Sequence, residues 1–154
     1  MNETERNALR SRFRFACGYC GVTETQNGAQ LTVDHFQPTS RGGPDDASNW
    51  VYSCFACNTF KGAFWEVAPS DFLLHPLRDD VAVHLHEEED GTFTALSSRG
   101  QLHLERLHLN RPELVEHRRE DRRQAERDQR ITRLVSQLGR MNEELAELRS
   151  RLNR

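Results

Sequence analysis

The chain has 154 residues, of which 36% are hydrophobic and 29% are charged, and its formal net charge is −3. This length suits one domain with an appendage, and the hydrophilic composition predicts a small core and an extended part. The net acidity argues against a simple nucleic-acid-coating protein, and no apolar run approaches the length that spans a membrane. The first residues are polar and charged rather than signal-like, so we expect a cytoplasmic protein.

The first predicted element is a helix over Glu3–Phe15. Arg6, Arg10 and Arg14 recur in it at four-residue spacing and therefore share one face. This face is either a nucleic-acid-binding surface, with Arg10 and Arg14 contacting phosphates, or a solvated face above packed apolar residues.

The four cysteines form two C-x2-C pairs that are predicted to bind one zinc ion. Each pair places two thiolates on one side of a tight turn, as a tetrahedral zinc site requires. The alternatives are disulfides or a redox dithiol, but a C-x2-C disulfide closes too short a loop to stabilise much. Four thiolates close the site, so this zinc is expected to be structural. The ligands are Cys17, Cys20, Cys54 and Cys57.

The segment between the cysteine pairs predicts a strand, a loop and a second strand. A β-prone stretch, 31–38, contains the pair Asp34-His35, and a glycine-rich loop follows at 40–46. Residues 49–53 predict the second strand, and the second cysteine pair leads into a helix expected over 58–66. The expected order is therefore strand, loop, strand, zinc knuckle and helix.

The string D-H-x-x-P-x-S-x-G-G-P-D-x-x-x-N-W, followed by C-x-x-C-N-x-x-K-G, resembles the HNH, or ββα-metal, endonucleases. The resemblance implies an α+β fold with a small ββα-metal core that a zinc site of four cysteines staples. It implies that His35 is the general base and that Asn49 braces the loop of the base. It also implies that Asp34 and Asn58 hold the catalytic divalent cation. The third position departs from the family name, being Asn58, and an all-oxygen pair favours Mg²⁺ or Mn²⁺.

The chemistry of phosphodiester hydrolysis explains these residue types. A base must deprotonate water and a cation must stabilise charge at the phosphate. Because neighbouring strand residues point to opposite faces, Asp34 and His35 can reach one phosphate only if the strand ends or twists there. Lys61 and Arg41 are the nearest candidates for binding the flanking phosphates of a DNA strand.

Residues 71–110 resemble an extension of a bacterial HNH subfamily. The sequence predicts hairpin strands over Val81–His86 and Thr92–Leu96, and then a helix over Gly100–Leu109. Five histidines in this extension match no standard metal spacing, and structural polar positions are the favoured interpretation.

Residues 111–154 predict a single long, charged helix. From Ile131 to Leu152, seven apolar residues alternate three and four apart, which is the pattern of a short coiled coil. Packing against the core is the alternative, but the charged segment before this stretch has no apolar face. We therefore expect a homodimer or a protein partner to bind 131–152.

The sequence predicts three parts: a nuclease core with its N-terminal helix at 1–70, the extension at 71–110, and the helical arm at 111–154. The predicted function is metal-dependent cleavage of DNA, as the nuclease subunit of a phage-defence or restriction system. The alternative is a catalytically silent HNH module that binds nucleic acid or a partner.

Overall fold

A computed structural model describes residues 1–66, 68 and 72–153. The chain divides into two compact units, Met1–Val115 and Glu116–Arg154. The sequence-based boundary near residue 70 falls outside the described residues. Within the described ranges, every helix is too short or too polar to cross a lipid bilayer.

The N-terminal helix α1 spans Glu3–Arg12 and begins with a capping box, in which Asn2 and Glu5 bond each other's backbone N–H groups. It ends three residues before the predicted end at Phe15. Arg14 and Phe15 have φ angles of 53° and 59°, which lie in the left-handed region and cannot continue a right-handed helix. A short helix, α2, follows at Glu24–Asn27.

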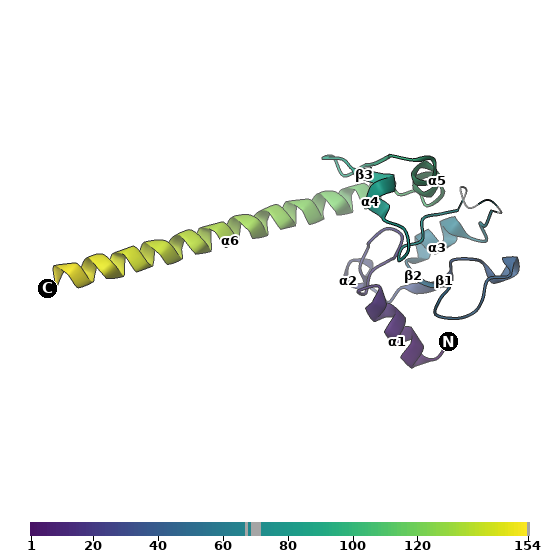
Figure 1. The fold of residues 1–154 in the computed structure, drawn as a ribbon, viewed down its shortest axis with the longest axis horizontal. Helices are drawn as coiled ribbons and strands as arrows, with labels where there is room; N and C mark the ends of the chain where they lie inside the picture. Colours follow the sequence, from purple (N-terminus) through teal and green to yellow (C-terminus); the bar gives the residue numbers. More distant parts are fainter. Residues whose placement is uncertain (67, 69–71, 154) are drawn as a thin grey trace. The chain divides into compact units, whose positions relative to one another are not determined.

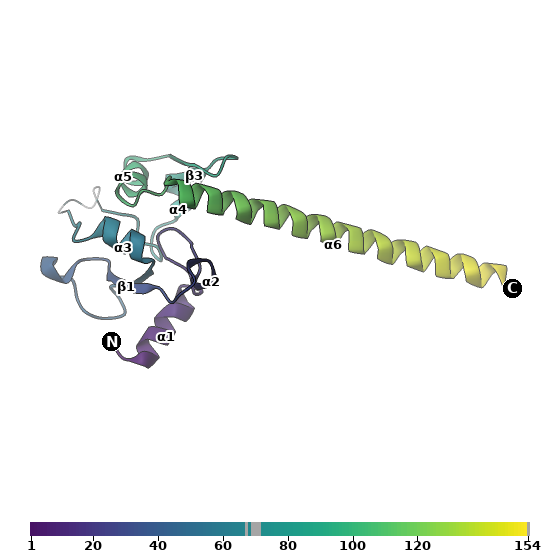
Figure 2. The same ribbon diagram turned by 180° about the vertical axis from the view of Figure 1, so that it is seen from behind.

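The next three elements are two antiparallel strands and a helix. Strand β1, Thr32–His35, pairs with β2, Trp50–Ser53, and the register places His35 opposite Trp50. The one-turn helix η1, Thr39–Arg41, lies in the loop between them. Helix α3, Phe55–Lys61, contacts β1 and lies beside the strand pair in both ribbon views (Figure 1, Figure 2). The predicted ββα order is confirmed.

Helix α3 begins and ends earlier than the predicted range 58–66. Cys54 caps its N-terminus, because the Sγ atom accepts a hydrogen bond from the Cys57 N–H at 3.4 Å. Gly62, with φ at 52°, ends the helix directly after Lys61. The cysteine pair therefore forms the first turn of the helix.

The extension contains a second, shorter hairpin. Strand β3, Leu85–Glu87, pairs antiparallel with β4, Phe93–Ala95, and α5, Ser98–Arg106, follows. The strand predicted over Val81–His86 is wrong for its first four residues, because Val81–His84 forms the helical turn α4.

Side-chain capping explains both helices of the extension. Asp80 caps α4 by accepting from the Ala82 N–H. Ser97 caps α5, which therefore begins two residues before the predicted Gly100. The predicted end of α5 at Leu109 is also too late, because His108 adopts a left-handed φ of 48°.

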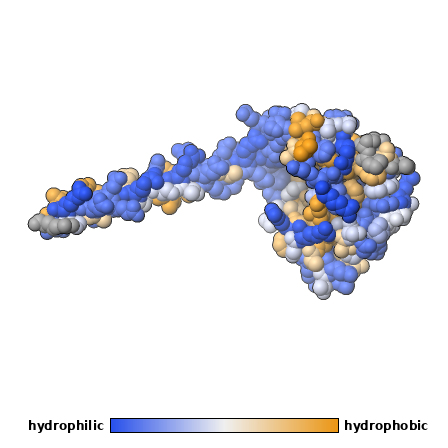
Figure 3. Space-filling model, viewed as in Figure 1, coloured by the Kyte–Doolittle hydropathy of each residue, from blue (hydrophilic) through white to orange (hydrophobic). Residues whose placement is uncertain are grey.

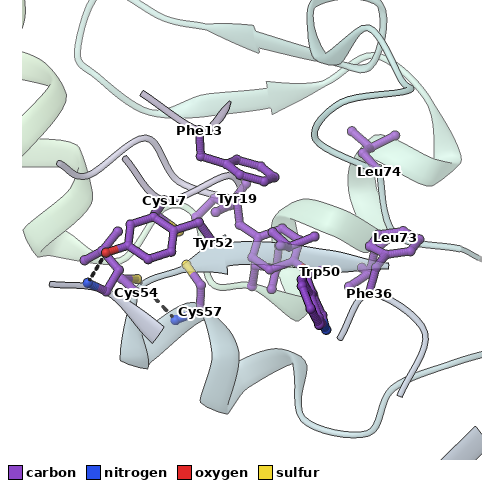
Figure 4. Packing of buried hydrophobic residues seen from close by; sticks show 14 of the residues in the cluster. Phe13, Cys17, Tyr19, Phe36, Trp50, Tyr52, Cys54, Cys57, Leu73 and Leu74 are labelled. Carbon is purple, nitrogen blue, oxygen red and sulfur yellow. Dashed lines mark hydrogen bonds between the residues drawn. The ribbon is translucent and has the colours of Figure 1, made fainter. Parts of the chain in front are cut away.

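One hydrophobic core joins the N-terminal residues, the ββα elements and the extension. Its buried side chains come from residues as far apart as Leu9 and Leu114. Figure 4 shows Trp50 and Tyr52 of β2 within this cluster, with Cys54 and Cys57 beside them. Burial of Tyr52, which is 0% exposed, ties the strand pair to the cysteine cluster.

Helix α6 runs without a break over Pro112–Leu152, so the predicted long C-terminal helix is confirmed. In the space-filling view, apolar atoms appear at intervals among polar ones along this helix (Figure 3). The seven apolar residues of the heptad pattern are 49% to 84% exposed: Ile131, Leu134, Leu138, Met141, Leu145, Leu148 and Leu152. Together with the two strand pairs and the cysteine cluster, this helix confirms the expected α+β class.

Candidate functional site

The four cysteine sulfurs lie within 4.8 Å of one another, in a cluster drawn partly in Figure 4. The Sγ atoms of Cys20 and Cys54 are 3.8 Å apart. Four sulfurs placed tetrahedrally at about 2.3 Å from a zinc ion are separated by about 3.8 Å. The thiols are not paired as disulfides. The donor set and its spacing therefore fit structural zinc.

The four thiols interact with one another and with one nearby cationic side chain, Arg111. Hydrogen bonding among the sulfurs, with Cys17 contributing most, lowers the pKa of Cys54 and raises the pKa of Cys57. The guanidinium of Arg111 donates to the Cys57 Sγ atom at 3.8 Å. A zinc ion with four thiolates would carry a net negative charge, and Arg111 would offset part of it.

Asp34 points into the core rather than into solvent, with 6% of its surface exposed. The Tyr19 hydroxyl donates to its Oδ2 atom at 2.6 Å, and the Lys61 ammonium donates to its Oδ1 atom at 3.0 Å. Burial raises the pKa of Asp34 and lowers the pKa of Lys61. Burial thus disfavours both charged forms, and the contact of the ammonium with the carboxylate at 3.0 Å opposes this effect, so the two groups form a buried ion pair. The contribution of Tyr19 was not visible in the sequence, where it is a spacer between two cysteines.

Lys61 is buried, whereas the sequence suggested that it binds a flanking phosphate of DNA. Its side chain is 1% exposed, and Nζ also donates to the His35 carbonyl oxygen at 2.7 Å. In this conformation it is not available to a flanking phosphate. Instead, it holds the end of β1 against α3.

Replacement of Lys61 by methionine is expected to destabilise the first unit by about 3–5 kcal/mol, because it leaves the Asp34 carboxylate buried without its partner. Urea unfolding of the zinc-loaded protein measures this loss. The double variant Asp34→Asn, Lys61→Met is the matched control and should lose less than the single variant, since it removes both charges. A single variant as stable as the unchanged protein would contradict the buried ion pair.

His35 lies at the end of β1 with 30% of its side chain exposed. Its Nε2 atom is 2.8 Å from Asp45 Oδ1, which also accepts from the Trp50 indole N–H at 2.8 Å. The hydrogen bond with His35 is the main cause that lowers the pKa of Asp45. The structure thus adds Asp45 to the candidate site. In the sequence, Asp45 is part of a Gly-Gly-Pro-Asp turn with no sign that it faces the histidine.

Asn49 connects the two ends of the loop that follows His35. Its Oδ1 atom accepts from the Gln37 N–H, and its Nδ2 atom donates to the carbonyl oxygens of Gln37 and Pro44, each at 2.8 Å. A Cβ atom at Gly43 would lie 1.9 Å from the Gln37 oxygen, so only glycine lets the backbone approach this closely. This geometry fits the brace role that the resemblance implied.

Asn58 lies on α3 facing β1, where its Nδ2 atom donates to Thr32 Oγ1 at 3.3 Å. Residues 32 and 34 are on the same face of the strand, so Asn58 and Asp34 belong to one interface between β1 and α3. A carboxylate has about four lone-pair positions, and the two hydrogen bonds on Asp34 leave some of them open. Carboxylate and amide oxygens are ligand types that Mg²⁺ and Mn²⁺ prefer, and in this structure the Lys61 ammonium is bound to Asp34 Oδ1.

The candidate phosphate-binding arginines have different environments. Arg10 forms two hydrogen bonds to the Glu24 carboxylate, at 2.7 and 2.8 Å, so its charge is already paired. The pKa of Glu24 falls to about 2, chiefly because of Arg10. Arg14 and Arg41 are exposed. The structure therefore leaves Arg14 and Arg41 as better candidates than Arg10.

The histidines of the extension do not form a metal site. Within the described residues, the four cysteines are the single group of three or more His, Cys, Asp or Glu side chains that could hold a metal ion. His103 is buried and its Nδ1 atom accepts from the Leu74 N–H at 3.1 Å, which is a structural contact.

Residues 17–64 match the family model described as HNH endonuclease. A search of curated proteins and a search of solved structures found no significant match. The matched range begins at the first zinc-site cysteine and includes both strands, the loop between them and α3. The chain therefore carries an HNH endonuclease domain at residues 17–64, with four cysteines placed to staple a zinc ion.

Proposed function

We propose that the protein is a metal-dependent endonuclease that hydrolyses DNA phosphodiester bonds. An HNH domain indicates nuclease activity in general. The observation that carries the proposal is the partly exposed His35, whose Nε2 atom is paired with Asp45 at 2.8 Å. A histidine held by a carboxylate at one ring nitrogen is suited to take a proton at the other.

The pairing with Asp45 defines the role of each nitrogen of His35. An ionised carboxylate can only accept a hydrogen bond, so in the neutral imidazole Nε2 carries the proton and Nδ1 has the free lone pair. In the proposed step, Nδ1 takes a proton from a water molecule while the water oxygen bonds to phosphorus. The bond from phosphorus to the 3′-oxygen breaks, and that oxygen is protonated by solvent. Asp45 keeps the ring oriented and stabilises the imidazolium that forms.

Asp34 and Asn58 would hold the divalent cation, Mg²⁺ or Mn²⁺. When bound, such a cation supplies positive charge at the phosphate and at the leaving oxygen. Lys61 donates to the same carboxylate, so a cation bound there would share Asp34 with its ammonium. Arg14 and Arg41 are proposed to contact flanking phosphates, where their contribution would be electrostatic and would weaken with salt.

Addition of Mg²⁺ to the zinc-loaded protein is expected to convert supercoiled plasmid to nicked or linear DNA. The buffer should contain no EDTA, because a chelator would also remove zinc. The control is the same protein without added Mg²⁺, with its zinc content measured at one ion per chain. If neither Mg²⁺ nor Mn²⁺ supports cleavage by a folded, zinc-loaded protein, the proposed activity is wrong.

A second candidate is a catalytically silent HNH module that binds nucleic acid or a partner. One observation favours it: both oxygens of Asp34 already bind internal donors, one of them the Lys61 ammonium. A silent module would bind DNA in a gel-shift assay and leave the plasmid intact with either metal. The plasmid assay therefore separates the two candidates.

In functional terms we propose three parts, with a nuclease core at 1–70, a supporting extension at 71–110 and a helical arm at 111–154. The use of all four cysteines as zinc ligands suits a reducing compartment such as the cytoplasm. The helical arm would join the nuclease core to another protein chain. This arrangement suits a subunit of a phage-defence or restriction system in which a partner selects the DNA.

The seven exposed apolar residues of α6 between Ile131 and Leu152 are proposed to form a parallel coiled coil with a second copy of this chain. With Ile131 at position a, the exposed residues fill a and d positions without interruption. Glu144 at position g then faces Arg149 at the following e position of the second copy, which is an attractive pair. Three heptads make a short coiled coil, so its stability should be marginal.

Replacement of Leu138 and Leu145 by lysine is expected to convert the dimer to a monomer, because it places charges in the apolar seam. Light scattering on the chromatographed protein measures this change. The matched control is Ser136→Lys with Ser150→Lys, which adds the same charge on the outer face of the helix. An unmodified chain that is monomeric at micromolar concentration would refute the homodimer and leave a different protein as the occupant.

A further inference from the structure

Two arginines from distant parts of the chain meet at the loop before β2. Arg12, the last residue of α1, donates to the Ala47 carbonyl oxygen at 2.9 Å. Arg78 of the extension donates to the carbonyl oxygen of the next residue, Ser48, at 2.8 Å. Both arginines are exposed, and neither has a role in the function proposed above. The fold thus brings together two cations that the sequence separates widely.

The charges of both arginines act on the same buried side chain, His75. Burial is the main cause that lowers the pKa of His75 to about 4. The positive charges of Arg78 and Arg12 lower this pKa further. Charge interactions weaken with distance, so this common effect agrees with the placement of both guanidinium groups beside one loop.

Most of the hydrogen-bonding capacity of these two guanidinium groups remains for a ligand. Each guanidinium has five N–H donors, and the structure describes one hydrogen bond for each of the two side chains. Arg78 also lines a surface cleft of about 380 Å³ together with Ser48 and Asn49. A ligand in this cleft can therefore contact Arg78 while the bond to the loop remains.

The positive charge of the two arginines is not paired with a carboxylate in the part of the chain that the structure describes. The acidic residues next to these contacts in the sequence have other partners. Asp46 accepts from the N–H and the hydroxyl of Ser48, and Asp79 is paired with the Arg99 guanidinium at 2.8 Å. Two such guanidinium groups on one loop are suited to phosphate oxygens, which accept charge-assisted hydrogen bonds.

The loop that carries these contacts also positions the proposed catalytic groups. Ala47 and Ser48 lie between Asp45, which bonds His35, and Asn49, which braces the loop after His35. From Asp45 to Ser48 the chain can span at most about 10 Å. A DNA strand has one phosphate per about 3.4 Å along the helix axis. The contacts of the two arginines therefore lie within a few phosphates of the position next to His35.

We propose that Arg12 and Arg78 form a clamp that binds DNA phosphates beside the one that is cut. The proposal rests on the nuclease function proposed above, because it requires a nucleic-acid substrate. Since Arg78 belongs to the extension, residues 71–110 take a direct part in binding DNA in addition to supporting the core. The clamp contacts the DNA backbone, so it should contribute affinity without sequence preference.

The experiment measures binding of the full, zinc-loaded chain to a short labelled DNA duplex in Mg²⁺-free buffer at several NaCl concentrations. The double variant Arg12→Gln, Arg78→Gln removes both charges, while each glutamine amide keeps a donor for the loop carbonyl. The slope of log K against log salt concentration decreases in magnitude by about 1 for each lost phosphate contact, so the double variant should lose about 2. At about 0.1 M NaCl its binding should weaken at least about tenfold.

The matched control is Arg133→Gln with Arg140→Gln, which removes the same charge from exposed positions of α6 and should leave the slope unchanged. The variant Arg12→Lys, Arg78→Lys keeps both charges and should retain most of the slope. Zinc content and unfolding show whether each variant is folded. If the double glutamine variant fails to fold, the single variants Arg12→Gln and Arg78→Gln test the clamp separately, with a slope change of about 1 each.

The outcomes separate the clamp from the nuclease function. If the glutamine variant keeps the slope of the unmodified chain, and the unmodified chain cleaves DNA when Mg²⁺ is added, the clamp is wrong and the nuclease function stands. An unmodified chain that neither binds nor cleaves DNA overturns both. Inorganic phosphate at constant ionic strength should not displace the DNA. If it does so at millimolar concentration, the two arginines form a site for free phosphate instead.

Discussion

Replacement of Cys54 by serine is expected to leave the first unit unfolded and free of zinc. A structural zinc ion contributes about 10–16 kcal/mol of apparent binding free energy, which exceeds the stability of a small domain. Cys54 is also the cap of α3, since its Sγ atom accepts from the Cys57 N–H. Zinc content and the near-ultraviolet circular dichroism of the buried aromatic side chains measure the two losses.

The matched control is Ser40→Ala, an exposed hydroxyl in the loop between the strands, which should keep one zinc ion per chain and the same dichroism signal. Chelation of zinc from the unmodified protein should reproduce the Cys54→Ser result, and added zinc should reverse it. A folded, fully active protein after complete removal of zinc would contradict the assignment of the cysteine cluster.

Replacement of His35 by alanine is expected to lower kcat for DNA cleavage by about 10²–10⁴-fold at saturating Mg²⁺, because it removes the proposed general base. Zinc content and unfolding should change little, since the His35 side chain is partly exposed. Asp45→Asn should lower kcat by a smaller factor, because the ring remains but its preferred tautomer is no longer enforced. Single-turnover cleavage of a labelled plasmid measures both effects.

A control for these variants is His86→Ala, which removes an exposed histidine outside the site and should retain full activity. A merely structural Asp45 would change stability without altering the pH profile of kcat, so that profile is the second measurement. Cleavage that persists undiminished in His35→Ala would show that the active site lies elsewhere.

The local sequence was sufficient to predict the cluster of four cysteines, the ββα order and the long C-terminal helix. Each of these depends on spacing along the chain. Two residues between cysteines fix a knuckle, and no further proline after Pro112 interrupts the helix before Leu152. The helix ends were less predictable, because caps such as Cys54 and Asp80 depend on backbone geometry that the periodicity does not encode.

Only the tertiary structure identified the partners of the candidate catalytic residues. Asp45 forms a hydrogen bond with His35, which lies ten positions earlier in the chain. Lys61, the last residue of α3, forms a hydrogen bond with Asp34 of β1. These pairs arise because the antiparallel strands and α3 bring distant residues together, and no local pattern records which long side chain turns inward. The side chain of Lys61 can be buried because its ammonium lies beside the Asp34 carboxylate. An ammonium without such a partner would be costly to bury. The sequence thus determined the residue types that an HNH domain requires, whereas packing determined which charges face solvent and which are already paired.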